Sequence, residues 1–294
     1  MTNLQRIALT RLLVSYALLF FIIRFFEYTT PSRLLGPPLF NLDLDLTYWL
    51  YKLSGLPDLL IGNRAGAILS DLLLAGTGLM AILRPLRRAW IISFSILLTL
   101  YALAFSTFSL GHTVAFYGLI VVFLPFWIAD NEKFNLAWQG IRYYTCFIYL
   151  AAFIWKTGIG DSFFYWQQGS GSFRYNLVEY LYHNPDSIMS GMSRWFISHD
   201  WALNTGHIFI ILLEAVMGIG LFTKKYDRLL FWVPFIIHIT TYIFADVFIF
   251  ELMILNFAFL TGRQLTAISR KFPALIYPQK HVLKTNQKDL SLAR

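Results

Sequence analysis

A lysine at the end of an apolar run is the residue of this sequence best placed for chemistry. The run from Cys146 to Trp155 contains no charged residue, and Lys156 follows it directly. An ammonium group at or just inside a bilayer surface is costly to keep charged, so it snorkels, finds a partner, or loses its proton and becomes a base. Lys156 is therefore either an anchor at a helix end or the proton acceptor of a site.

Other ionisable side chains in apolar segments could share a site with this lysine. Such residues are expensive inside a bilayer and usually face a bundle interior or a water-filled cavity. The sequence therefore predicts a polar pocket, with two tryptophans beside it. The candidates are Lys156, His112, His207, Asp246, Glu214, His238, Glu251 and Asp71, with Trp155 and Trp166 as the aromatic neighbours.

Each of these residues also has a structural interpretation. His238 and Glu251 lie at matching depths and could form a hydrogen-bonded pair that holds two helices together. Asp71 could do the same on its Ala/Gly-rich helix. Glu214 follows His207 by seven positions, so both fall near one helical face, and either helix pairing or a pocket role fits it.

Composition places these residues in a membrane protein. The chain of 294 residues is 57% hydrophobic, 18% aromatic and 14% charged, with a mean hydropathy of +0.57. Soluble domains have about 25% charged residues. The single cysteine excludes an intramolecular disulfide and a cysteine-based zinc site, and no H-x-x-x-H or H-E-x-x-H spacing occurs, so no metal is expected. No phosphate-loop motif is present either, and the net charge of +8 fits membrane orientation better than nucleic-acid binding.

The elements that position these residues are predicted to be transmembrane helices. Hydropathy and length favour an all-α bundle of about eight helices. The apolar run from Leu229 to Leu260 is too long for one helix, which places a turn near Asp246. The predicted spans are 7–27, 64–83, 89–108, 112–129, 139–157, 205–223, 228–245 and 246–262.

Basic residues orient this bundle with both termini in the cytoplasm. Most of the 24 Lys and Arg residues, Arg11 and Arg142 among them, fall on the side of the N-terminus. The excess of positive charge marks that side as cytoplasmic. The outer side carries Arg24, Arg33, Lys52, Arg64, Lys156, Arg174 and Arg194.

A single transmembrane domain over residues 1–262 is predicted, followed by a basic cytoplasmic tail at 263–294. Two long outer segments, 28–63 and 158–204, are rich in aromatic residues. These segments are typical of an interfacial belt or of short helices lying on the bundle, and a lid over a site is the alternative.

Several ordered segments resemble the vitamin K-dependent gamma-carboxylase and the related bacterial HTTM (horizontally transferred transmembrane) domain proteins. The run from Tyr149 to Lys156, followed by Trp166-Gln-Gln-Gly169, is similar to the family's Y-x-x-A-G-x-x-K…W-x-x-G segment. The helix with His207 and Glu214, the region of His238, and Gly111-His112 also resemble family segments.

This resemblance implies a specific chemistry. The lysine that matches Lys156 would deprotonate an isoprenoid quinol of the vitamin K type, assisted by the histidine that matches His112. The resemblance thus implies an enzyme that is a carboxylase-like or quinol-dependent lyase or oxidoreductase. It also implies a multi-pass integral membrane protein, which would lie in the bacterial inner membrane if the source is prokaryotic. Membrane lipids and a lipophilic small molecule are the expected partners, with no nucleic acid, and no protein partner can be named.

The sequence also departs from the family pattern. Phe153 stands where the family has the glycine before its lysine, and no large outer domain follows the helices. Carboxylation of a protein substrate is therefore not expected. The alternative function is a non-enzymatic membrane component, either a transporter or an assembly partner, in which the polar cluster is structural.

Overall fold

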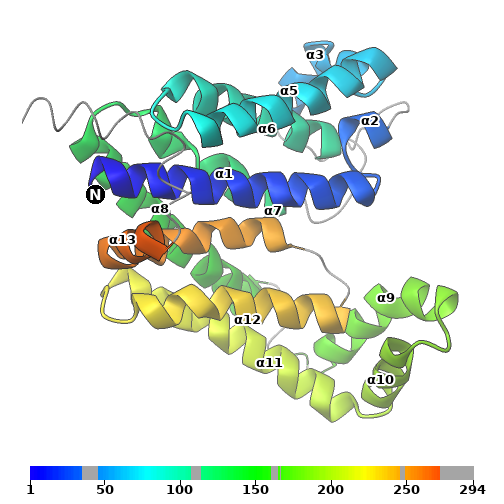
Figure 1. Cartoon of the computed structure of the whole chain (residues 1–294). Coiled ribbons are helices and arrows are strands. Elements are labelled where there is room, and N and C mark those ends of the chain that lie inside the picture. Colours follow the sequence, from blue (N-terminus) through cyan, green and yellow to red (C-terminus); the bar gives the residue numbers. More distant parts are fainter. Residues whose placement is uncertain (35–45, 107–113, 160–164, 166, 246–248, 272–294) are drawn as a thin grey trace, which may run out of the picture. The chain divides into compact units, whose positions relative to one another are not determined.

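The computed structural model describes residues 1–34, 46–106, 114–159, 165, 167–245 and 249–271, and this part of the chain is helical throughout, without strands (Figure 1). By its internal contacts the chain falls into two compact units. Unit 1 comprises Met1–Phe108, Phe126–Glu132 and Thr261–Arg294, and unit 2 comprises Ser109–Pro125 and Lys133–Leu260. The sequence predicted a single transmembrane domain over residues 1–262, and a hydropathy pattern does not show which of its helices pack together.

Three long helices form the framework of unit 1. They are α1 (Asn3–Phe26), α5 (Arg64–Leu83) and α6 (Arg88–Ser106), with α5 packed against both of the others. Gly78 allows this close packing, because a Cβ atom there would meet Leu18 of α1 and Phe94 of α6. The short helices of the unit are α2 (Pro31–Leu34), α3 (Leu46–Leu53), α4 (Leu56–Leu60) and, at its C-terminal end, α13 (Gly262–Lys271).

Two buried polar residues connect the helices of unit 1. Arg11, which the sequence counted with the cytoplasmic charges, is buried, and its Nε donates a hydrogen bond to Ile82 O at 2.8 Å. The carboxylate of Asp71 accepts a hydrogen bond from the backbone N–H of Ser32 at 3.2 Å, at the start of α2. Asp71 thus has a structural partner within unit 1, where it helps to satisfy the free N–H groups of a helix start.

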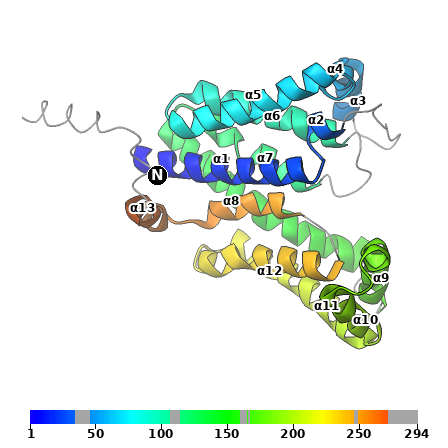
Figure 2. The same ribbon diagram turned by 45° about the vertical axis from the view of Figure 1, so that its right-hand side comes forward.

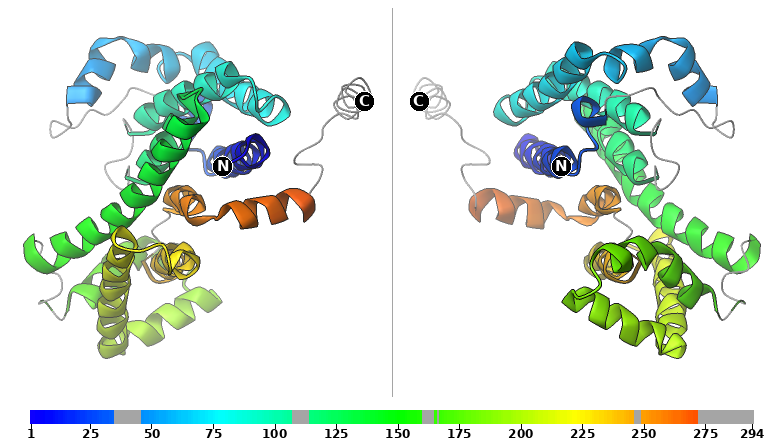
Figure 3. Two further views of the ribbon diagram at one scale, coloured as in Figure 1. Left: turned by 90° about the vertical axis from the view of Figure 1, so that its left-hand side faces the viewer. Right: turned by 90° about the vertical axis from the view of Figure 1, so that its right-hand side faces the viewer.

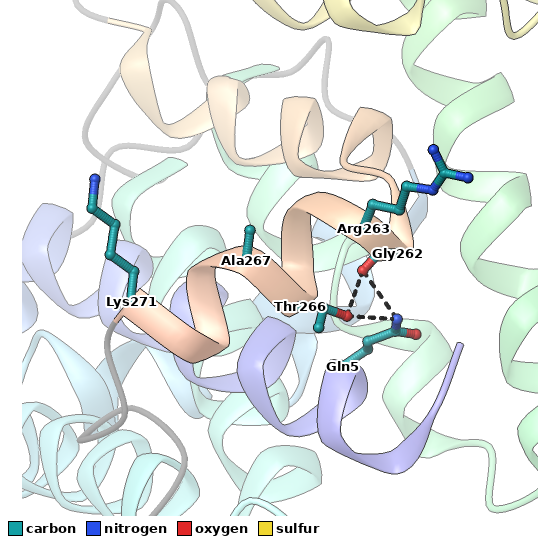
Figure 4. A pocket seen from close by; sticks show the side chains of 6 residues that line it. All are labelled: Gln5, Gly262, Arg263, Thr266, Ala267 and Lys271. Carbon is teal, nitrogen blue, oxygen red and sulfur yellow. Dashed lines mark hydrogen bonds between the residues drawn. The ribbon is translucent and has the colours of Figure 1, made fainter.

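Helix α13 lies across α1 in unit 1. Figure 3 shows α1 end-on and α13 lengthwise below its N-terminus. Gln5 Nε2 of α1 donates hydrogen bonds to Gly262 O at 3.0 Å and to Thr266 Oγ1 at 3.1 Å (Figure 4). Residues 263–271 of the basic tail therefore belong to an ordered helix that is fixed to α1.

Unit 2 is built around a long helix that is more polar than its neighbours. This helix, α8 (Asn131–Ile154), has its first two residues in unit 1 and the rest in unit 2, and it continues into one wide π-helical stretch, η2 (Trp155–Ile159). The helices α11 (Asp200–Met217) and α12 (Asp227–Ala245) follow later in the chain. The remaining elements are α7 (Val114–Val121), α9 (Gln168–His183), α10 (Ile188–Ile197), and the 3₁₀ segments η3 (Gly218–Leu221) and η4 (Phe250–Phe259), while η1 (Leu124–Trp127) crosses the boundary between the units.

Five helices of the described residues are long and apolar enough to cross a membrane. They correspond to the predicted spans 7–27, 64–83, 89–108, 205–223 and 228–245. Many large apolar side chains on them are exposed, such as Leu69, Leu72 and Leu79 of α5, as expected for helices that face lipid. The membrane class predicted from composition agrees with these helices.

The other three predicted spans have a different form. The span 139–157 lies within α8 and η2, whose apolar content is below that of the five spanning candidates. Among the described residues, the apolar helices found in the spans 112–129 and 246–262 are the short ones Gly118–Trp127 and Phe250–Phe259. In unit 2, α7 and η4 pack against each other.

The aromatic segment 158–204, which the sequence predicted to face outward, forms short helices where the structure describes it, as one of the sequence interpretations expected. Figures 1 and 2 show α9 and α10 at one end of α11. Phe173 and Leu177 of α9 pack against Leu203 of α11, and Phe196 of α10 and Phe244 of α12 join them. Tyr175, Tyr182 and Trp201 are exposed, which fits an interfacial belt.

Candidate functional site

Three polar side chains recur at seven-residue intervals along α8 and η2. They are Arg142, Tyr149 and Lys156, and each one contacts a different partner in unit 2. Residues separated by seven positions lie on one face of a helix, two turns apart. We call these three residues the polar ladder. It contributes to the polar character of this stretch of the chain.

Arg142 makes the first contact of the polar ladder and is fully buried. Its guanidinium donates to both carboxylate oxygens of Asp227, with the shortest distance 2.6 Å, and to the carbonyl oxygens of Gly220 and Thr223 at 2.8 Å. This geometry satisfies the charge and nearly all donors of a buried arginine. The sequence placed Arg142 among the cytoplasmic charges, whereas the structure makes it the link between α8, η3 and α12.

Tyr149 makes the second contact, with His238 of α12. The distance between Tyr149 Oη and His238 Nε2 is 2.7 Å, and both side chains are buried. His238 Nδ1 has no hydrogen-bond partner in the described part of the chain. The predicted pair of His238 with Glu251 is therefore wrong. Glu251 is completely buried in η4, on another element of unit 2.

Lys156 makes the third contact, an ion pair with Glu214 of α11. The distance from Nζ to Glu214 Oε1 is 2.6 Å, and the side chains are 29% and 6% exposed. Glu214 Oε2 has no hydrogen-bond partner among the described residues. Lys156 lies in η2, and single π-helical turns inside α-helices occur frequently at functional sites. Lys156 is thus partly exposed to solvent and is paired with a buried carboxylate.

A cavity of about 170 Å³ in unit 2 lies along α11, the helix that carries Glu214. Its wall includes Leu203, His207 and Ile210 of α11, and Glu214 continues the same helical face by one more turn. His207 Nε2 is buried without a hydrogen-bond partner in the described residues. The charge of Lys156 acts on both His207 and His238. The cavity is otherwise mainly apolar, and is lined also by Gly169, Ser172, Phe173, Phe196, Ala202, Gly206, Thr240, Thr241 and Phe244.

The structure brings together part of the set predicted from sequence. Lys156, Glu214, His207 and His238 form one connected region of unit 2, whereas Asp71 is bonded within unit 1. Trp155 is 56% exposed, because it lies one position away from the ladder face, and it lines no part of the cavity. His112, Trp166 and Asp246 lie outside the described residues.

Sequence reasoning missed two members of the polar ladder. Tyr149 was used only as part of a motif, and Arg142 only as a charge that orients the bundle. The signal that could have found both was their spacing from Lys156, because a polar residue at every seventh position of an apolar helix marks an inward-facing stripe. Asp227, at the start of α12, could then have been sought as the partner of the buried arginine.

Comparison of the chain with protein families, with curated proteins and with solved structures finds no match. Within the described residues, no group of three or more His, Cys, Asp and Glu side chains is arranged to hold a metal ion.

Proposed function

We propose that this chain is a multi-pass membrane protein of the vitamin K-dependent gamma-carboxylase-like type that binds a lipophilic molecule with an aromatic head group and moves a proton at Lys156. The proposal includes the eight predicted spans and the cytoplasmic location of both termini. The observation that carries it is the Lys156–Glu214 ion pair on the helical face that continues from the cavity. An ionisable pair beside an apolar cavity is a combination that binding sites for lipophilic molecules use.

The size and lining of the cavity support a ring as the ligand. An engineered apolar cavity of about 150 Å³ accepts benzene, which makes the 170 Å³ here suitable for the ring of a quinol, with its isoprenoid chain in the lipid. Phe173 and Phe196 offer apolar walls, and the unpartnered Nε2 of His207 offers a hydrogen bond to a polar group on the ring. A quinol, when bound, supplies a weakly acidic hydroxyl group.

The ion pair gives the chain a way to free the lysine for proton uptake. The short Nζ–H to Oε1 hydrogen bond allows the proton to move from Lys156 to Glu214, which leaves a neutral amine beside a neutral carboxylic acid. The amine can then accept a proton from a ligand hydroxyl, and the partial exposure of Lys156 lets that proton leave to water.

Lipid analysis of the purified protein tests the proposal. We expect a quinone to co-purify with the wild-type protein in mild detergent and to be lost from Gly206→Leu, because a Cβ at Gly206 meets no neighbour and the new side chain would fill the cavity. Gly171→Leu is the matched control, since Gly171 also has open space around its Cβ but lies outside the cavity lining. Equal quinone content in the wild-type protein and Gly206→Leu would refute the proposal.

A second candidate function is favoured by the polar ladder itself. Arg142, Tyr149 and Lys156 all bond across helices, which is also what a structural component or assembly partner would need. Lys156→Met separates the two functions. An enzyme would keep its bound quinone in this variant but lose a quinol-dependent reaction that the wild-type protein shows, whereas a structural component would show no such reaction in either form. A loss of stability is expected in both cases, because the ion pair is broken.

A further inference from the structure

A second cavity, in unit 1, is lined by two arginines and lies at the ends of membrane-spanning helices. Its volume is about 290 Å³, and it lies between the start of α1, the turn from α5 to α6, and the segment from Phe126 to Asn131. The lining residues are Asn3, Arg6, Ile7, Pro85, Leu86, Arg88, Ile91, Phe126, Ala129 and Asn131. The function proposed above uses none of them.

Arg6 and Arg88 place two positive charges at one cavity. Arg6 donates to Ile128 O at 2.6 Å, and Arg88 donates to Trp127 O at 3.4 Å, so both reach the same segment of backbone. The charge of Arg88 acts on Arg6. Two like charges that share a cavity repel each other unless an anion lies between them. No acidic side chain is among the described residues that line this cavity.

The surroundings of the cavity favour a lipid over a soluble anion. Arg6 is in the first turns of α1 and Arg88 starts α6, and both helices are candidate membrane spans, so the cavity lies where the hydrocarbon region gives way to head groups. Ile7, Leu86 and Ile91 add an apolar part to the lining. Basic hollows between membrane helices are typical binding sites for anionic lipid head groups.

The neighbouring hollow on the other side of α1 is basic as well. Figure 4 shows Arg263, Ala267 and Lys271 along one side of α13, at spacings of one turn, with Gln5 at its base. Arg84 and Arg87, in the turn that precedes α6, are exposed. This end of unit 1 is therefore positive around the arginine cavity, which raises the local concentration of anionic lipid.

We infer that the cavity of Arg6 and Arg88 binds the phosphate head group of an anionic phospholipid. The planar guanidinium groups suit the phosphate oxygens, because each offers a fork of N–H donors. Asn3 and Asn131 offer amide groups to a glycerol or sugar hydroxyl, and the acyl chains lie along the apolar lining. This is a binding site separate from that of unit 2, and it predicts that stability of the protein depends on the lipid charge.

Native mass spectrometry of the full chain in detergent tests this site. We expect phosphatidylglycerol to be retained in preference to phosphatidylcholine, and Arg88→Gln to weaken phosphatidylglycerol binding by about tenfold. Arg6→Gln should have a similar effect. Arg6 also donates hydrogen bonds to backbone carbonyl groups, so Arg6→Gln could fail to fold. Arg88→Gln loses only one long hydrogen bond and is the decisive variant in that case.

The controls separate a defined site from general attraction. Arg87→Gln removes an exposed charge next to the cavity, and Arg64→Gln removes one at the start of α5, so neither should change binding by more than about twofold. Equal losses in Arg87→Gln and Arg88→Gln would overturn the site. Displacement of the lipid by millimolar inorganic phosphate would overturn the assignment of a lipid. Equal retention of phosphatidylcholine and phosphatidylglycerol would overturn the assignment of an anionic head group.

Discussion

The Lys156–Glu214 ion pair predicts unequal effects when its two partners are removed. Lys156→Met leaves a carboxylate that is 6% exposed, whereas Glu214→Met leaves an ammonium whose side chain is 29% exposed. An uncompensated charge in a fully buried pair costs about 3–5 kcal/mol. Since Lys156 is partly exposed, we expect Lys156→Met to lower the free energy of unfolding by about 2–3 kcal/mol, below that limit.

Glu214→Met should lower the free energy of unfolding by only about 1 kcal/mol, because the flexible lysine can carry its charge into water. The double variant replaces the pair by two apolar side chains of similar size, a change that is often close to neutral. With a neutral double variant, the coupling energy equals the sum of the two single losses, about 3–4 kcal/mol. SDS titration in mixed micelles, followed by far-ultraviolet circular dichroism, measures all four free energies.

An exposed ion pair in the same unit provides the control. Arg174 and Asp200 are 2.7 Å apart, close to the distance in the ladder pair, but their side chains are 49% and 45% exposed. Arg174→Gln should change the free energy of unfolding by less than about 0.5 kcal/mol. Equal losses for Lys156→Met and Glu214→Met, or strictly additive effects in the double variant, would refute the reasoning from burial.

Three further predictions concern the packing around the polar ladder. Gly220→Ala should destabilise unit 2 by about 1–3 kcal/mol in the same titration, because the added Cβ would overlap Cys146 and Leu230, whereas Gly140→Ala, with open space at its Cβ, should be neutral or stabilising. Tyr149→Phe should lower the free energy of unfolding by about 1–3 kcal/mol, because it leaves His238 Nε2 buried without a partner. The double variant Tyr149→Phe/His238→Leu should recover part of that loss. If it recovers none, the loss does not come from this hydrogen bond. Cys146, the single cysteine, is buried. A maleimide should therefore label it about 100-fold more slowly in mild detergent than in SDS, which corresponds to an opening free energy of about 2.7 kcal/mol. Equal labelling rates in the two detergents would contradict its burial.

The sequence by itself determined the class of protein and most of its long helices. Runs of apolar residues near 20 in length predict membrane helices, because an unpaired peptide group in hydrocarbon is too costly for any other local structure. The boundaries of α5, predicted at 64–83, agree with Arg64–Leu83 in the structure. The sequence also identified Lys156, Glu214, His207 and His238 as buried or half-buried polar residues, because such residues stand out against an apolar background.

Tertiary structure alone decided which of these residues bond to each other. Position in a predicted span gives the depth of a residue in the bilayer, and depth alone paired His238 with Glu251, whereas the structure pairs it with Tyr149. Partners depend on the rotation of each helix and on which helices are neighbours. An apolar residue facing lipid looks the same in sequence as one facing another helix, so the hydropathy pattern does not fix either property. For the same reason Arg142 could be counted as a surface charge until α8, η3 and α12 were seen to enclose it.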